Sequence, residues 1–124
     1  MWGAPAACGD LAIRRAKPAA AAALARVQVD SWREAYRGII PQHYLDNLSY
    51  AAHERQWRRT LVSRGWAFLA VWQGQIVGLV SGGRCRSLKG FAGEIYVLYC
   101  LAAFHGRGIG RALFDAAHYE LTLR

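Results

Sequence analysis

The stretch CLAAFHGRGIGRALFDAA, residues 100–117, constrains the fold most, because an apolar run passes through three glycines in five positions into a helical pattern. Gly106, Gly108 and Gly110 lack Cβ atoms, so the backbone there can adopt positive φ and a ligand can approach it closely. The first turn of the following helix carries about four unpaired N–H groups and the positive end of the helix dipole. These features predict an anion site, best suited to phosphate, and Arg107 and Arg111 add positive charge beside it.

The spacing disfavours two common phosphate-binding loops. A Rossmann fingerprint reads G-x-G-x-x-G and leads to an acidic residue about 20 positions later, whereas Arg111 stands at the third glycine position here and the sequence stops at Arg124. A P-loop needs G-K followed by Ser or Thr, and the sequence has none.

The remaining pattern predicts alternating short elements. Residues 11–16 form a candidate edge strand, and Pro18 suits the first turn of a helix that runs to about Val29 and is followed by a second short helix. Its buried stripe holds Ala20, Leu24, Val27 and Ser31. Ser49 caps a further helix that ends at residues 64–65 and has Tyr50, Trp57 and Leu61 on its apolar side.

The second half of the chain reads as strands and a final helix. Two β-rich runs meet at Gln73-Gly74-Gln75 and predict an antiparallel hairpin. Residues 94–102 are so continuously apolar that we expect a strand buried on both faces. The last helix starts at Gly108 or Ile109, with a stripe of Ile109, Leu113, Ala116 and Leu123. The order β, α, α, β, β, β, α predicts an α+β sandwich rather than a series of βαβ units.

Composition narrows the class of protein. With 124 residues, 54% of them hydrophobic, the chain fits a single domain, residues 1–124, with a substantial core. No apolar run reaches the roughly 20 residues that cross a bilayer, and the N-terminus lacks a secretory pattern, so we expect a cytoplasmic protein that does not bind membranes. The odd number of cysteines and the scattered histidines predict reduced thiols and no metal site.

The formal net charge of +8 fits nucleic acid, a membrane surface or a small anionic ligand equally well. The basic residues are spread along the chain rather than gathered in one tail, which favours a solvated surface and makes nucleic-acid binding the weakest alternative.

The segment LYCLAAFHGRGIGRALFDAA resembles the acetyl-CoA signature of the GCN5-related N-acetyltransferases (GNAT), [Q/R]-x-x-G-x-[G/A]. In that family the loop amides hold the coenzyme's pyrophosphate and the preceding strand bonds the pantetheine arm. The resemblance therefore implies acetyl-CoA as co-substrate, bound by Leu98, Cys100, His105, Gly106, Arg107, Gly108, Ile109, Gly110 and Arg111. His105 stands where the family usually has Gln or Arg, so we expect weaker phosphate binding.

The segments DSWREAYRGIIPQHYLDNLS and AFLAVWQGQIVGLVSGG resemble the first-helix region and the central strands of small GNAT members. The resemblance implies a GNAT-like, mixed, mostly antiparallel sheet flanked by helices, but lacking the family's C-terminal strands and helix. The missing elements and the open edge that they leave at the last strand predict either a homo-oligomer or a truncated fragment of a longer protein. Trp32 and Tyr36 are the candidate lining of an acceptor pocket, although packing against the core explains them equally well.

The resemblance implies transfer of an acetyl group to a primary amine of a small molecule or peptide; the alternative is a catalytically silent module that binds CoA or oligomerises. Glu94 and Tyr99 are the candidate catalytic residues. Strand alternation predicts that Glu94 and Leu98 share a face, so that Glu94 could take the amine's proton, and that Tyr96 and Tyr99 lie on opposite faces. The sequence favours neither a covalent role for Cys100 nor a hydrolase.

Overall fold

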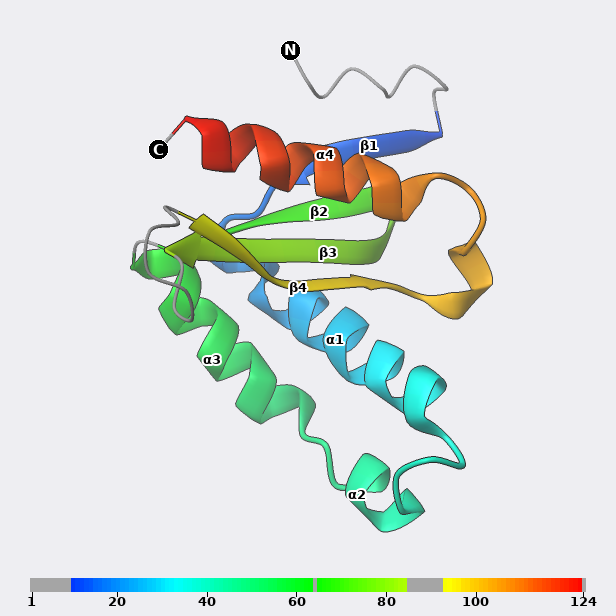
Figure 1. The fold of residues 1–124 in the computed structure, drawn as a ribbon. Coiled ribbons are helices and arrows are strands. Elements are labelled where there is room, and N and C mark those ends of the chain that lie inside the picture. Colours follow the sequence, from blue (N-terminus) through cyan, green and yellow to red (C-terminus); the bar gives the residue numbers. More distant parts are fainter. Residues whose placement is uncertain (1–9, 64, 85–92, 124) are drawn as a thin grey trace.

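The computed structural model describes residues 10–63, 65–84 and 93–123. Their elements are β1 (Leu11–Arg15), η2 (Pro18–Ala20), α1 (Ala21–Tyr36), α2 (Gln42–Asp46), α3 (Tyr50–Val62), β2 (Trp66–Trp72), β3 (Gln75–Arg84), β4 (Gly93–Cys100), η3 (Ala102–Phe104) and α4 (Ile109–Thr122). The strands form one antiparallel sheet in the order β1-β2-β3-β4, with α4 on one face and α1 and α3 on the other (Figure 1). The predicted α+β class is confirmed.

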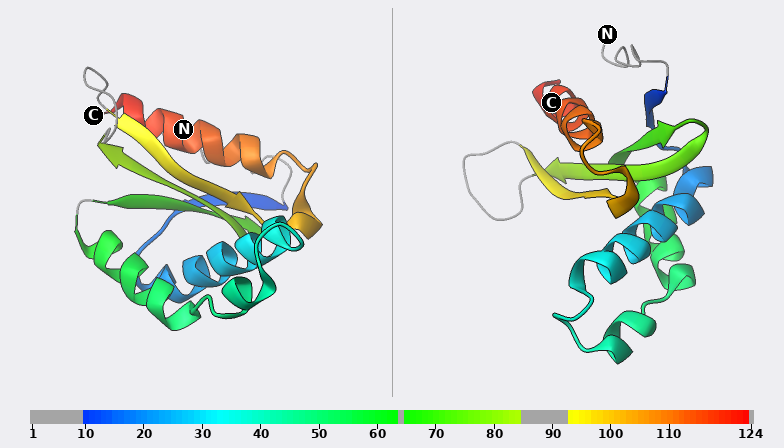
Figure 2. Two further views of the ribbon diagram at one scale, coloured as in Figure 1. Left: turned by 60° about the horizontal axis from the view of Figure 1, so that its bottom comes forward. Right: turned by 90° about the vertical axis from the view of Figure 1, so that its right-hand side faces the viewer.

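The sheet separates two apolar clusters, because successive strand residues point to opposite faces. On β2, Trp66 and Ala70 pack with Ile109 and Leu113 of α4. The intervening Leu69 packs with Leu24, Val27 and Trp57 from α1 and α3. Figure 2 shows the resulting three layers from two further directions.

Helix α1 is longer than the sequence predicts. Its stripe of Leu24, Val27 and Ser31 is buried as expected, but the helix runs unbroken to Tyr36, so the predicted end at Val29 and the separate short helix are wrong. Tertiary contacts outweigh the weak helix propensity of Asp30 and Ser31. Ser31 lies against the sheet layer, and the Asp30 carboxylate accepts a hydrogen bond from the Tyr50 hydroxyl.

Arg33 of α1 fastens α2 and the start of α3. Its guanidinium donates to the Leu45 carbonyl (3.0 Å), the Leu48 carbonyl (3.2 Å) and the Tyr50 hydroxyl (3.0 Å). Ser49 caps α3 as predicted, by accepting the Ala52 N–H. Tyr50 is exposed and is not part of the apolar side, because its hydroxyl donates to Asp30 and accepts from Arg33. The pKa of Tyr50 is raised, mainly by the hydrogen bond to Asp30 and to a smaller extent by desolvation.

The predicted hairpin is confirmed. Gln73 and Gly74 have φ of 49° and 83°, the pair of positive values that a type I′ turn requires. In α4, Ile109, Leu113 and Ala116 are buried as predicted, but Leu123 lies beyond the helix and is exposed. Glu120 is buried instead and pairs with Arg15 of β1. Within the described residues, no helix has the length and apolar character of a membrane span.

Strand β4 differs from the prediction in two ways. It is partly exposed rather than buried on both faces, because β3 is its one strand neighbour in the described part of the chain. It also contains a bulge: Ser81 pairs with Val97 and Gly82 with Ile95, so Tyr96 has no partner across the ladder. The bulge reverses the alternation, since Ile95 packs in the α4 cluster whereas Val97 packs in the α1 and α3 cluster.

Candidate functional site

The glycine loop lies between η3 and α4 and has the geometry that its sequence predicts. Gly106 and Gly108 both adopt left-handed conformations, with φ of 80° and 79°. Gly108 is the N-cap of α4, no side chain caps its first turn, and that turn contains no acidic residue. A Cβ placed on either glycine would meet no atom within 4 Å. The helix start is therefore an open, unshielded set of N–H donors, which suits a phosphate group.

The other loop residues have distinct roles. Ile109 is buried in the core, so only its backbone can serve a ligand. The Arg107 guanidinium lies 5.1 Å from the ring centroid of Trp72 and 5.7 Å from that of Phe104, which holds its charge beside the loop. Arg111 pairs with Asp115 one turn later at 3.2 Å, so its charge is partly neutralised.

The outer edge of β4 presents backbone groups next to this loop. Leu101 donates its N–H to Val77 of β3. Because hydrogen-bonding groups alternate along an antiparallel strand, Leu98 and Cys100 direct their N–H and C=O groups to the opposite edge. The His105 ring already uses part of this edge, since its Nε2 donates to the Cys100 carbonyl at 2.8 Å.

A cavity of about 380 Å³ lies between α1 and β4; we call it the Glu34 cavity. It brings together residues predicted for three different roles: Tyr99 for catalysis, Leu98, Cys100 and His105 for the coenzyme, and Tyr36 for the acceptor. Ser31, Glu34, Ala35 and Ala102 complete its lining. Trp32 does not line it but supports it, donating its indole N–H to the Tyr99 hydroxyl at 2.7 Å. Its ring centroid lies 4.8 Å from that of Tyr36.

Sequence reasoning missed Ser31 and Glu34 as site residues. Ser31 is 7% exposed, and its hydroxyl has no hydrogen-bond partner among the described residues. Glu34 follows three positions later on the same helix face and accepts the Ala102 N–H through Oε1 at 2.8 Å. Burial raises the pKa of the Cys100 thiol, and the charge of Glu34 raises it further. The available signal was Ser31, a polar residue on the predicted buried stripe.

The bulge corrects two inferences about β4. Tyr99 packs with Val97 in the α1 and α3 cluster, and a Cβ on Gly83 would lie 3.0 Å from the Tyr96 hydroxyl. Tyr96 and Val97 line a common cavity, so both tyrosines face the side of α1 and α3 rather than opposite sides. Alternation from Ile95 places Glu94 on that side too, whereas Leu98 faces α4. Glu94 and Leu98 therefore do not share a face, and Glu94 does not line the Glu34 cavity.

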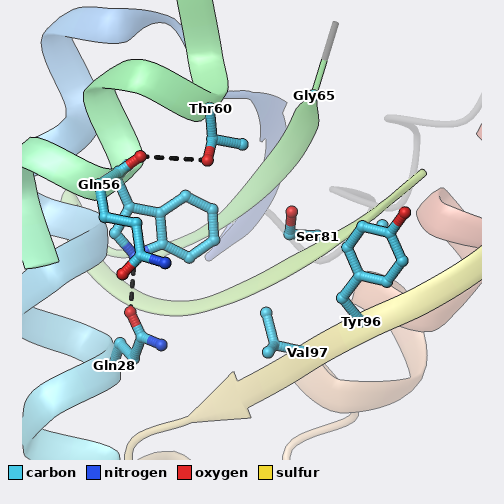
Figure 3. Close-up of a pocket in the computed structure, with 9 residues that line it drawn as sticks. Gln28, Gln56, Thr60, Gly65, Ser81, Tyr96 and Val97 are labelled. Atoms are coloured by element: carbon cyan, nitrogen blue, oxygen red, sulfur yellow. Dashed lines mark hydrogen bonds between the residues drawn. The ribbon is translucent and has the colours of Figure 1, made fainter. Parts of the chain in front are cut away.

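A second cavity of about 310 Å³, which we call the Gln28 cavity, lies between α1, α3 and the sheet (Figure 3). Among the described residues its lining carries no charged side chain and consists of Gln28, Gln56, Trp57, Thr60, Gly65, Ser81, Gly82, Tyr96 and Val97.

Three side-chain donors that line the Gln28 cavity are paired within the chain. The Trp57 indole donates to Gln28 Oε1 at 2.7 Å, and the Thr60 hydroxyl donates to the Gln56 carbonyl at 3.1 Å. The Ser81 hydroxyl donates to the Trp66 carbonyl at 2.8 Å.

Residues 26–120 match the model of the acetyltransferase (GNAT) family. The chain is similar to the uncharacterized N-acetyltransferase YuaI of Bacillus subtilis (strain 168), with 37% identity over 102 residues. The matched region is 82% of this chain but 58% of that protein, so the chain spans less than two-thirds of this relative.

Two solved structures resemble the fold. One is the PaiA N-acetyltransferase from Thermoplasma acidophilum in complex with coenzyme A, with a TM-score of 0.75, 17% identity and coverage of 90% of this chain and 72% of that one. The other is a GCN5-related N-acetyltransferase from Rhodopseudomonas palustris, with a TM-score of 0.68, 26% identity and coverage of 93% and 68%.

Proposed function

The chain belongs to the acetyltransferase (GNAT) family, and we propose that it transfers an acetyl group from acetyl-CoA to a primary amine of a small molecule or peptide. One observation carries the proposal: the open glycine loop at the start of α4 continues into the outer edge of β4, and the Glu34 cavity lies along that edge. Diphosphate, pantetheine arm and acceptor would thus have adjacent places on one surface.

The residues present fit the coenzyme. The backbone N–H groups of residues 106–111 would hold the diphosphate, because the space that Cβ atoms would occupy at Gly106 and Gly108 is empty of protein atoms. The outward N–H groups of Leu98 and Cys100 and the C=O group of Leu98 would bond the amides of the pantetheine arm. Ile109 and Gly110 contribute backbone, and Arg107 contributes charge.

Acetyl-CoA supplies an activated thioester, so the net reaction breaks a C–S bond, forms an amide C–N bond and releases CoA as a thiol with one proton from the amine. Of the two candidate catalytic residues, Tyr99 is the better placed, since it lines the cavity. Its oxygen accepts the Trp32 N–H, which leaves the phenolic O–H available to donate a proton to the departing sulfur. Glu94 would have to act from outside this cavity.

Calorimetry with CoA tests the proposal through two matched glycine substitutions. Gly108→Ala and Gly38→Ala introduce the same side chain at φ of 79° and 82°, and neither new Cβ meets an atom within 4 Å. We expect Gly108→Ala to weaken CoA binding by about tenfold or more, from backbone strain and lost access to the phosphate, while Gly38→Ala binds like the wild type.

Thiol release from acetyl-CoA over a panel of amines then tests turnover. Release above the rate of hydrolysis supports the enzyme; CoA binding without such release identifies a silent CoA-binding module. A wild-type chain that gives no binding heat with CoA contradicts both.

A further inference from the structure

We propose that Ser31 and Glu34 bind the acceptor, and that the acceptor is a primary amine with a single positive charge and an apolar body. The inference rests on the proposed function and adds to it the class of acceptor and the residues that select it. Two polar side chains on one face of α1, with apolar surface in the same cavity, carry the argument.

Ser31 supplies a hydroxyl that the fold leaves unused. The residue is 7% exposed, and its oxygen finds no partner among the described residues. Burying an unpaired hydroxyl is unfavourable, so the position invites a ligand group that hydrogen-bonds to it. A hydroxyl oxygen can accept one N–H of an ammonium or amine group.

Glu34 supplies the charge. The Ala102 N–H fixes Oε1 of its carboxylate at 2.8 Å, which orients the group on the cavity wall and leaves Oε2 without a partner in the described residues. An ammonium group is the complement of a carboxylate, and their charge-assisted hydrogen bond is among the stronger polar contacts. Ser31 and Glu34 are three residues apart on α1, so both can reach one nitrogen.

The number of charges limits the acceptor to one ammonium group. Glu34 is the one acidic residue among the described residues that line this cavity, so a second ammonium would find no other carboxylate from them. The chain as a whole carries a formal charge of +8, which repels polycations. A monoamine therefore fits better than a polyamine.

The remaining lining selects the body of the acceptor. Ala35 and Tyr36 present apolar surface, and Tyr36 is 36% exposed, so this surface is accessible to a ligand. The tilted rings of Trp32 and Tyr36 lie beside it. Leu98 and Cys100, which would hold the pantetheine arm, line the same cavity, so an amine bound there lies next to the arm.

Cys100 provides a binding readout that needs no turnover, because the residue lines the same cavity and the charge of Glu34 acts on its thiol. With Cys8→Ser and Cys85→Ser, Cys100 is the one remaining cysteine. The measurement is the ratio of its iodoacetamide alkylation rates with and without 2-phenylethylamine, 2-phenylethanol or spermidine. We expect the amine to protect Cys100 at about tenfold lower concentration than the uncharged alcohol or the polyamine.

Glu34→Gln keeps an oxygen that can accept the Ala102 N–H and removes the charge, so we expect the amine to protect this variant no better than the alcohol does. Ser31→Ala should weaken the protection of Cys100 by the amine and leave the protection by the alcohol unchanged. The matched control is Glu54→Gln, which alters an exposed glutamate paired with Arg58 on α3 and should leave protection unchanged.

Equal protection by amine and alcohol in the wild-type cavity, or full protection in Glu34→Gln, overturns the inference. The alkylation measurements contain no CoA, so they test the acceptor site by itself. A chain that fails to bind CoA in calorimetry rejects the proposed function independently of their result. In an active chain, Glu34→Gln should raise the KM for the amine and leave the affinity for CoA unchanged.

Discussion

The Glu34 cavity and the Gln28 cavity have similar sizes and lie on the same side of the sheet, but they use their polar groups differently. Around the Gln28 cavity, three side-chain donors are paired within the chain, as Figure 3 shows for two of them. Around the Glu34 cavity, one buried hydroxyl is unpaired and one carboxylate oxygen is unused. Polarity alone therefore does not mark a binding site; the Glu34 cavity differs in that a buried, unsatisfied hydroxyl lines it.

The largest expected effect is on stability and concerns Gly82 in the lining of the Gln28 cavity. A Cβ at Gly82 would lie 2.4 Å from the Glu94 carbonyl and 2.9 Å from the Trp66 ring, so Gly82→Ala should lower the free energy of unfolding by about 2–3 kcal/mol.

The neighbouring Gly83→Ala is its control. There the new Cβ meets the Tyr96 hydroxyl at 3.0 Å, the far end of a side chain that can move, so the loss should stay below about 1 kcal/mol. Urea denaturation measures both variants. Equal midpoints would show that Gly82 does not hold the β3–β4 bulge.

A serine pair sharpens the comparison. Ser81→Ala removes the donor to the Trp66 carbonyl and should cost about 1 kcal/mol of unfolding free energy. Ser31→Ala removes a buried hydroxyl that has no partner, so stability should be unchanged or slightly higher. Thermal and urea unfolding of the two variants provide the test; a larger loss for Ser31→Ala would mean that its hydroxyl is satisfied within the protein.

The smallest expected effect concerns the Cys100 thiol, whose pKa is raised first by burial and second by the charge of Glu34. Glu34→Gln removes the charge, which is the smaller of the two causes, so the pKa of the Cys100 thiol should fall. At a fixed pH below that pKa, alkylation of Cys100 should then become faster. A raised thiol pKa stabilises the folded chain at lower pH, and this contribution is lost as the pH rises through the folded-state value.

In Glu34→Gln the loss of stability at alkaline pH should accordingly be smaller. Rates of alkylation as a function of pH measure the shift, with Glu54→Gln as the unaffected control. A thiol pKa that does not move in Glu34→Gln would place the carboxylate too far from Cys100 to act on it.

The loop could be predicted because its chemistry is local. Gly106 and Gly108 fix their own backbone geometry, as Gly74 does in the hairpin, and Ser49 caps the helix that directly follows it. Neighbouring residues decide these features, so a short stretch of sequence is sufficient.

The cavity could not be predicted in the same way, because it depends on contacts between distant segments. The bulge at Tyr96 depends on the register between β3 and β4. It places both Tyr96 and Tyr99 on the side of the sheet that α1 and α3 cover. Beyond Val29, α1 is held by contacts with distant residues such as the hydrogen bond from Tyr50 to Asp30, and Glu34 is oriented by Ala102, 68 residues away. The predicted alternation failed at Glu94 for the same reason. The unpaired Tyr96 reverses the side of the sheet to which the preceding β4 residues point.

The hydrogen bond from His105 to the Cys100 carbonyl joins two surfaces that the proposed coenzyme would touch at once. The imidazole belongs to the phosphate loop, while the carbonyl belongs to the strand edge. A coenzyme that bonded to the Cys100 carbonyl would compete with the His105 imidazole for that oxygen, so binding at the strand edge would also act on a residue of the phosphate loop.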